Sequence, residues 1–148
     1  MSDLRALINA ARRDNDPNRV LRATPYAKFL DITTDLVEGR YVCHLNFRDD
    51  HIGNPLLPAL HGGVTGALLE SAAIFHLVWD LEATSIPKTI NMSIDYLRPG
   101  RPADTYASGV ATKQGREVTN VRVEAWQESR DRLIAAAHGH FLLDSDNN

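Results

Sequence analysis

The sequence predicts an α+β domain in which an antiparallel sheet wraps around one central helix. The stretch from Gly62 to about Leu81 is apolar almost all the way round, which is typical of a buried helix. Segments with period-2 alternation precede and follow this stretch, and short links between them indicate antiparallel hairpins. The 148 residues are enough for one domain with a sizeable core.

The N-terminal part is predicted to contain a helix, a loop and two strands. A helix with N-cap chemistry at its start covers about residues 3–13, and we assign residues 1–24 to this helix and a polar loop. Alternating segments at 29–36 and 40–47 read as strands joined by a tight turn. Residues 48–60 are rich in Gly, Asn and Pro, and we expect an irregular loop there.

The part after the central helix has the periodicity of strands. Apolar side chains alternate with Asn, Ser and Asp through residues 90–96. Further segments that read as strands cover about 103–113, 117–127 and 132–143. The last residues, 144–148, are polar and are predicted to form a disordered tail.

The composition argues against several classes of protein. The formal net charge is -3 and no strongly basic face is evident, so we expect no nucleic-acid partner. Cys43 is the single cysteine and cannot form an internal disulfide, which fits a reducing compartment. We expect no stretch to be long and apolar enough to span a membrane, and the first residues lack a signal-peptide core. We therefore expect a cytoplasmic protein with no membrane partner.

One carboxylate interrupts the apolar helix. Two glycines, Gly62 and Gly63, follow His61 at its start, and Glu70 lies two turns further on among apolar helical neighbours. Glutamate is almost never fully buried without a partner. Glu70 therefore either pairs across an interface or has a chemical role, and the spacing alone leaves both readings open.

Two sequence blocks resemble a known family. His61 lies in LHGGVTGALLESAA, and the block TINMSIDYLRPGRPAD follows it. Together they resemble the hotdog-fold thioesterases of the 4-hydroxybenzoyl-CoA and phenylacetyl-CoA (PaaI-like) type, over about residues 25–143. The resemblance implies a hotdog fold, a homodimer or homotetramer, and a hydrolase that cleaves acyl-CoA thioesters at a dimer interface without a cofactor.

The resemblance also assigns roles to individual residues. Glu70 stands at the position of the family's catalytic acid, as general base or nucleophile. Gly62 stands where a helix N-terminal amide polarises the thioester carbonyl, and His61 supports that turn or the carbonyl. Asn54 is similar to the family's asparagine upstream of this motif, although the loop is one residue longer here. Thr89 stands where some members place a hydroxyl that holds the water.

Further residues are predicted to bind the substrate. Gly63 would let the thioester approach the backbone closely. Arg98 and Arg116, at strand ends, are candidates for the phosphates of CoA, because a guanidinium donates paired hydrogen bonds. Phe75 of a neighbouring subunit is expected to help shape the acyl pocket.

Other functions compete with the thioesterase. The rival is a non-catalytic module that binds acyl-CoA or another small ligand on the same fold, since fold does not fix function. A dehydratase would need a catalytic histidine on a motif that the sequence lacks. His138 and His140 share a strand face, but we interpret them as interface polar residues and expect no metal.

Overall fold

The computed structural model describes residues 2–144. Three helices, α1 (Ser2–Arg13), α2 (Asn18–Arg22) and α3 (Pro25–Phe29), precede the strands β1 (Ile32–Val37) and β2 (Arg40–Leu45). The predicted first helix is therefore confirmed, whereas α2 and α3 were missed.

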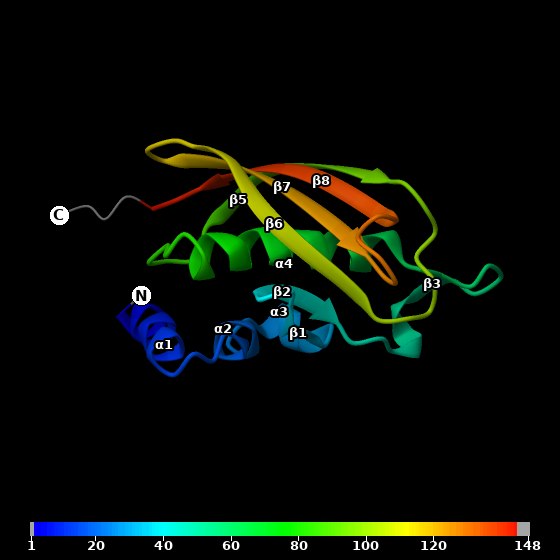
Figure 1. Cartoon of the computed structure of the whole chain (residues 1–148), viewed down its shortest axis with the longest axis horizontal. Coiled ribbons are helices and arrows are strands. Elements are labelled where there is room, and N and C mark those ends of the chain that lie inside the picture. Colours follow the sequence, from blue (N-terminus) through cyan, green and yellow to red (C-terminus); the bar gives the residue numbers. More distant parts are fainter. Residues whose placement is uncertain (1, 145–148) are drawn as a thin grey trace.

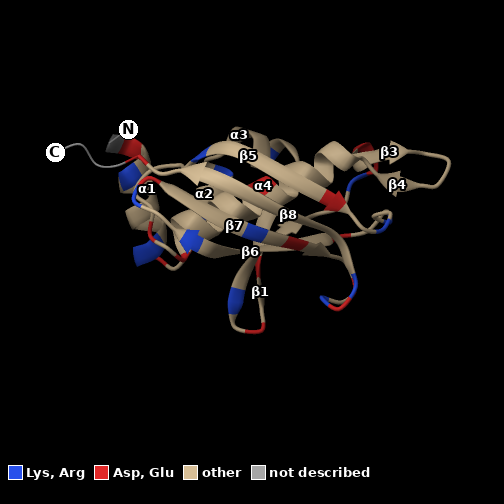
Figure 2. Ribbon diagram, turned by 90° about the horizontal axis from the view of Figure 1, so that it is seen from above, with Lys and Arg blue, Asp and Glu red and all other residues tan. Residues whose placement is uncertain are grey.

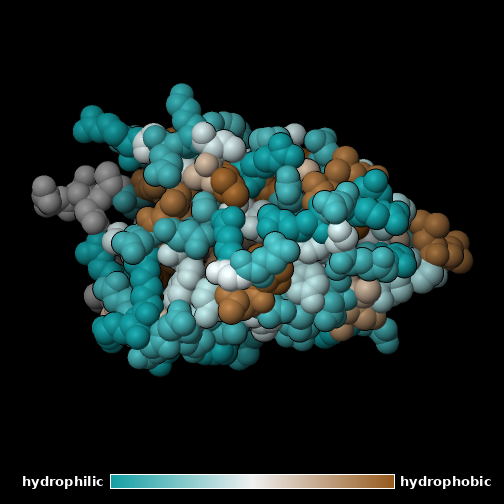
Figure 3. Space-filling model, viewed as in Figure 1, coloured by the Kyte–Doolittle hydropathy of each residue, from teal (hydrophilic) through white to brown (hydrophobic). Residues whose placement is uncertain are grey.

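The central part leads into the long helix. A 3-10 turn, η1 (Asp49–His51), is followed by the short antiparallel strands β3 (Ile52–Asn54) and β4 (Ala59–Leu60), and then by α4 (Gly62–Trp79). The segment that was expected to be an irregular loop thus contains a small hairpin. Leu56 and Leu57 at its tip are 94% and 65% exposed. Figure 3 shows an apolar tip at the end of the molecule where Figure 1 places this hairpin.

Four strands complete the sheet. They are β5 (Lys88–Tyr96), β6 (Thr105–Gln114), β7 (Val118–Trp126) and β8 (Leu133–Leu142). The strand order is β1-β2-β6-β7-β8-β5, and every pair is antiparallel. Within this chain β1 and β5 are therefore the two edges of the sheet.

The sheet encloses the helix. Figure 1 shows α4 between β5–β8 on one side and β1, β2 and the N-terminal helices on the other. Leu68, Leu69 and Leu77 of α4 are fully buried against the sheet. The predicted α+β architecture, an antiparallel sheet around one long central helix, is confirmed.

The expectation about membrane-length segments was wrong for α4. By length and composition this helix is apolar enough to cross a membrane. Half of this helix is buried inside the domain, mainly against the sheet, which identifies α4 as its core helix.

The differences near the N-terminus have local causes. Pro25 takes the first turn of α3, a position that favours proline, and Leu21, Ala27 and Leu30 bury their side chains in the main core. Asp31 then adopts a positive φ of 59°, which ends the helical segment before β1. The strand predicted from residue 29 therefore begins three residues later.

The helices α1 and α2 close one end of the molecule. Ile8, Ala11 and Val20 form a second apolar cluster with Val78 of α4. Their outer surface carries both signs of charge (Figure 2), with ion pairs Arg19–Asp14 at 2.5 Å and Arg22–Asp16 at 2.6 Å. Of the predicted disordered tail, only residue 144 is described, and residues 145–148 lie outside the described part.

Candidate active site

The first turn of α4 is held by the residue that precedes it. His61 is the N-cap, and its Nδ1 accepts a hydrogen bond from the Gly63 amide at 2.9 Å. The His61 carbonyl accepts from the amides of Val64 (3.0 Å) and Thr65 (3.2 Å). A Cβ at Gly63 would lie 2.9 Å from His61 Nδ1, so a larger residue here would displace the capping imidazole.

The Gly62 amide is the free donor of this turn. Among the described residues, none accepts a hydrogen bond from it. A helix N-terminus with an unpaired amide attracts an anion or a polarised carbonyl oxygen, because the helix dipole adds positive potential there. This end of α4 can therefore stabilise developing negative charge on an oxygen atom.

A side chain from the sheet contacts the same turn. The Tyr96 hydroxyl, at the end of β5, donates to the Gly62 carbonyl at 2.8 Å. Both residues line a cavity of about 350 Å³, together with Leu57, Leu60 and Arg98. The sequence alone assigns no role to Tyr96, although this residue begins the Tyr-Leu-Arg-Pro segment of the second sequence block, at the end of the strand.

Glu70 faces solvent on the uncovered side of α4. The sheet leaves this side of the helix open within this chain, so Glu70 is exposed although its helical neighbours are apolar. The Thr89 hydroxyl of β5 donates to Glu70 Oε1 at 3.2 Å. The structure thus brings Glu70 and Thr89 together, as two of the predicted site residues.

The two chemical groups of α4 lie far apart in one subunit. Glu70 follows Gly62 by eight residues, which at 1.5 Å per residue is about 12 Å along the helix. A carbonyl oxygen bound at Gly62 and an attacking group at Glu70 must both lie about 3 Å from the reacting centre. One subunit therefore does not bring Gly62 and Glu70 to the same thioester.

Two predicted site residues have structural surroundings instead. Asn54 Oδ1 accepts from the Leu56 amide at 3.0 Å, so this side chain stabilises its own hairpin turn. Phe75 is only 3% exposed and stacks on Trp79 in the core, with ring centroids 6.1 Å apart. Its predicted contact with substrate has no support in this structure, because it lies on the covered side of α4.

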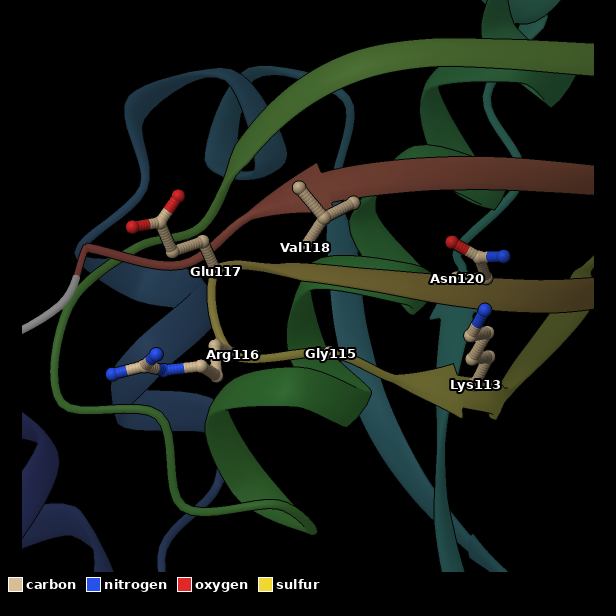
Figure 4. Close-up of a pocket in the computed structure, with 6 residues that line it drawn as sticks. All are labelled: Lys113, Gly115, Arg116, Glu117, Val118 and Asn120. Carbon is tan, nitrogen blue, oxygen red and sulfur yellow. The ribbon is translucent and has the colours of Figure 1, made fainter.

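The two candidate arginines lie at opposite ends of the sheet. Arg98 donates to the Leu133 carbonyl at 2.7 Å, where β8 begins. Arg116 lies in the β6–β7 turn beside a cavity of about 680 Å³, where Figure 4 shows its guanidinium pointing away from Lys113. These two arginines of one subunit cannot hold the same phosphate group.

The potential metal ligands among the described residues are scattered. Within residues 2–144 there is no group of three or more His, Cys, Asp or Glu side chains that could hold an ion. His140 Nδ1 lies 2.7 Å from Asn91 Oδ1 on the neighbouring strand, so it has a polar partner in the sheet. The buried thiol of Cys43 is surrounded by core residues, and desolvation raises its pKa, which makes it a poor ligand and nucleophile.

Comparisons with known proteins agree with this architecture. A family model described as the thioesterase superfamily matches residues 57–134. A crystal structure of a protein from Chromobacterium violaceum is 37% identical, with a TM-score of 0.75, covering 95% of this chain and 98% of that chain. No curated protein matches the chain.

Two further solved structures carry informative descriptions. A mutant of the phenylacetic acid degradation protein PaaI from Thermus thermophilus is 28% identical, with a TM-score of 0.65, and covers 81% of this chain and 99% of that chain. A Bacillus halodurans protein solved with CoA is 23% identical and shares the fold, with a TM-score of 0.74 over 99% of this chain and 94% of that chain. The family model spans more than half of the chain, and the hotdog fold and the PaaI-like resemblance are confirmed: the chain belongs to the thioesterase superfamily.

Proposed function

We propose that this protein hydrolyses acyl-CoA thioesters to a free acid and CoA, and that two subunits build each active site. The observation that carries the proposal is on α4, which presents a Gly62 amide with no acceptor among residues 2–144 and a solvent-facing carboxylate at Glu70, about 12 Å apart. Similarity to a protein described as PaaI and to one solved with CoA supports the substrate class.

A two-fold dimer resolves the separation. If two α4 helices lie antiparallel across a dimer axis, Gly62 of one subunit comes beside Glu70 of the partner subunit, and two equivalent sites result. The edge strand β5 favours such an association, because Ile90, Tyr96 and Leu97 at this edge are 53%, 57% and 52% exposed. We expect a homodimer, or a homotetramer built from such dimers, in the cytoplasm.

The chemistry then follows from the paired groups. The Gly62 amide receives the thioester oxygen, and its charge grows there as the carbonyl carbon is attacked. In one route Glu70 takes a proton from a water whose oxygen bonds to the carbonyl carbon, the C–S bond then breaks, and the proton passes to the leaving thiolate. In the other route the Glu70 carboxylate bonds to the carbonyl carbon and the C–S bond breaks, which releases the CoA thiolate. Water then cleaves the mixed anhydride to the free acid and the Glu70 carboxylate, and the proton released goes to the thiolate. In both routes the Thr89 hydroxyl holds Oε1 and leaves Oε2 for the reaction.

The same dimer suggests where CoA enters. With antiparallel α4 helices, the Arg98 end of one subunit lies beside the Arg116 end of its partner. Arg98 of one subunit and Arg116 of the partner subunit can then flank one tunnel mouth, although they are at opposite ends of a single subunit. Guanidinium groups suit the phosphates of CoA because each donates two parallel hydrogen bonds.

The test is thiol release from a panel of aryl and fatty acyl-CoAs. The Glu70→Gln variant should fold normally and lose most of its turnover, because glutamine keeps the shape but cannot act as base or nucleophile. Glu82→Gln, on the exposed loop after α4, is the matched control and should keep wild-type kcat. Wild-type protein that binds an acyl-CoA but releases no thiol would identify the rival binding module.

The dimer has its own measurement. Sedimentation velocity at micromolar concentration should show a dimer or tetramer. A monomer as the only species would remove the composite site, because one subunit separates Gly62 from Glu70.

A further inference from the structure

We infer that Tyr96 is a positioning residue for the reaction, which clamps the peptide group between Gly62 and Gly63 so that the free Gly62 amide keeps its direction. The inference rests on the proposed function, since it concerns the amide that would receive the thioester oxygen. It assigns the hydroxyl and the ring of Tyr96 to separate tasks.

The need for a clamp comes from the sequence. Two consecutive glycines begin α4, and glycine loses more conformational freedom on folding than any other residue. Helix ends also fray, because their first amides lack partners within the helix. An amide that must point at a developing oxyanion therefore needs support from outside the helix.

Two side chains supply that support to one peptide group. Its carbonyl, that of Gly62, accepts from the Tyr96 hydroxyl at 2.8 Å. Its N–H, that of Gly63, donates to His61 Nδ1 at 2.9 Å. The preceding peptide group is fixed as well, because the His61 carbonyl accepts from Val64 and Thr65. Gly62 therefore lies between two immobilised peptide groups, which sets the direction of its N–H.

The sheet holds Tyr96 in place. Tyr96 lies opposite Ala135 in the β5–β8 pairing. The next two amides, of Leu97 and Arg98, both donate to the Ile134 carbonyl, at 2.9 and 3.1 Å. The phenol thus connects the first turn of α4 to β5, which is itself held by its hydrogen bonds to β8.

Two glycines of α4 lie against the phenol. A Cβ at Gly62 would lie 3.4 Å from the Tyr96 ring, and a Cβ at Gly66 would lie 3.6 Å from its hydroxyl. Positions 62 and 66 are one turn apart on the same helical side, so the ring lies along a glycine-lined surface. The ring is also 57% exposed and forms a wall of the cavity beside Gly62.

The Tyr96→Phe variant separates the two tasks. It keeps the ring, and therefore the cavity wall, but removes the hydroxyl that holds the Gly62 carbonyl. We expect kcat to fall about tenfold, equivalent to about 1.4 kcal/mol, while KM stays unchanged, because amide direction matters most when the oxyanion forms. Tyr106→Phe is the control, since the Tyr106 ring on β6 stacks on His44 of β2 and on Trp126 of β7, away from the first turn of α4.

A spectroscopic measurement tests the clamp without turnover. The probe is an acyl-CoA analogue in which a methylene group replaces the thioester sulfur, so that a ketone carbonyl occupies the site and cannot be hydrolysed. Its stretching frequency should move to lower values on binding to the wild type and to Tyr106→Phe. The displacement should be smaller with Tyr96→Phe.

The outcomes are distinct. A lower kcat at constant KM together with a smaller carbonyl displacement supports the inference. Wild-type kcat, or an unchanged displacement, in Tyr96→Phe overturns it. If no acyl-CoA is hydrolysed by the wild type, the proposed enzymatic function fails, and the carbonyl displacement still decides whether Tyr96 orients the Gly62 amide.

Discussion

The two ends of α4 use their polar groups in opposite ways. At the N-terminal end, His61 lends one ring nitrogen to the Gly63 amide, and the Gly62 amide has no acceptor among the described residues. At the C-terminal end, both ring nitrogens of His76 are engaged. Its Nδ1 lies 2.6 Å from Asp80 Oδ2, and its Nε2 accepts from the Ala111 amide at 3.0 Å.

Cations complete the C-terminal end. Arg40 donates to the Gly109 carbonyl at 2.8 Å and lies 3.3 Å from Asp80. Arg12 of α1 donates to the Val78 carbonyl in the last turn. Positive side chains at this end interact favourably with the negative end of the helix dipole.

The difference shows which end is structural and which is available for chemistry. Buried polar groups in folded proteins are almost always paired, and both ring nitrogens of His76 follow that rule, whereas Arg12 Nε is buried with no partner among the described residues. The N-terminal end leaves one donor free beside a cavity, with positive potential and, among the described residues, no acceptor to neutralise it. Changes at the two ends should therefore separate activity from stability.

The largest effect is expected from removing the free donor alone. Gly62→Pro deletes the amide hydrogen at the first helical position, where proline is well accommodated, and His61 already has the extended backbone (φ −61°, ψ 131°) that a following proline requires. We expect kcat to fall by about 10²–10³ with no loss of thermal stability.

The matched control is Gly62→Ala. It keeps the amide, and its Cβ would lie at an ordinary 3.4 Å from the Tyr96 ring. Steady-state kinetics and thermal melts of both variants make the comparison. Equal kcat values for the two variants would contradict the role of the Gly62 amide.

A mixing experiment tests whether the two groups act across subunits. Glu70→Gln and Gly62→Pro should each be nearly inactive, yet a heterodimer has one site in which both groups are intact. Random reassortment of equal amounts should restore about a quarter of wild-type activity, since half of the dimers are mixed and each has one working site of two. Thiol release after co-refolding measures it, and each variant refolded alone is the control. Activity that stays at the level of the separate variants would place both groups in one subunit.

Much of the fold was predictable because its long elements have clear periods. The strands predicted at 117–127 and 132–143 occur at Val118–Trp126 and Leu133–Leu142, and the central helix ends two residues before the predicted end. The short helices α2 and α3 span one turn or slightly more, so they leave no periodic signal, and their formation depends on burying Leu21 and Leu30.

The site was predictable only in part. Motif spacing singled out Gly62 and Glu70, but a helix that is apolar on every side does not indicate which side the sheet leaves open. Phe75 was therefore expected at the substrate and lies in the core. For Glu70 the sequence left open an interface partner or a chemical role, and within this chain the side chain faces solvent. The hydrogen bond from Tyr96 to Gly62 joins residues from distant parts of the chain, so no local pattern could reveal it.

At the C-terminal end of α4 we expect stability, not turnover, to change. His76→Ala would leave the half-buried Ala111 amide without its acceptor and Asp80 without its closest partner, at a cost of about 2–3 kcal/mol in the free energy of unfolding. Denaturant unfolding at fixed protein concentration measures this loss. His138→Ala, at an exposed position on β8, is the control and should change stability little. A large loss of kcat in folded His76→Ala protein would contradict the division between the two ends.

The smallest effect concerns acid. Burial alone would raise the pKa of Asp80, but the hydrogen bond from His76 and the positive charge of Arg40 outweigh it, so the pKa of this carboxyl is lowered below 3.8. A lowered pKa in the folded state means that the carboxylate contributes stability above the unfolded value, and that this contribution disappears as the pH falls through the folded value. Asp80→Asn should therefore be less stable than the wild type near neutral pH, and the two should converge as the pH drops below about 4. Urea unfolding as a function of pH gives both curves.

Some pH dependence should remain in Asp80→Asn, because the Phe47 amide and His44 also lower the pKa of Asp104. The opposite outcome is a difference in the free energy of unfolding that grows as the pH falls. It would mean that the fold stabilises the protonated form of Asp80, which would contradict the charge pairing at the C-terminal end of α4.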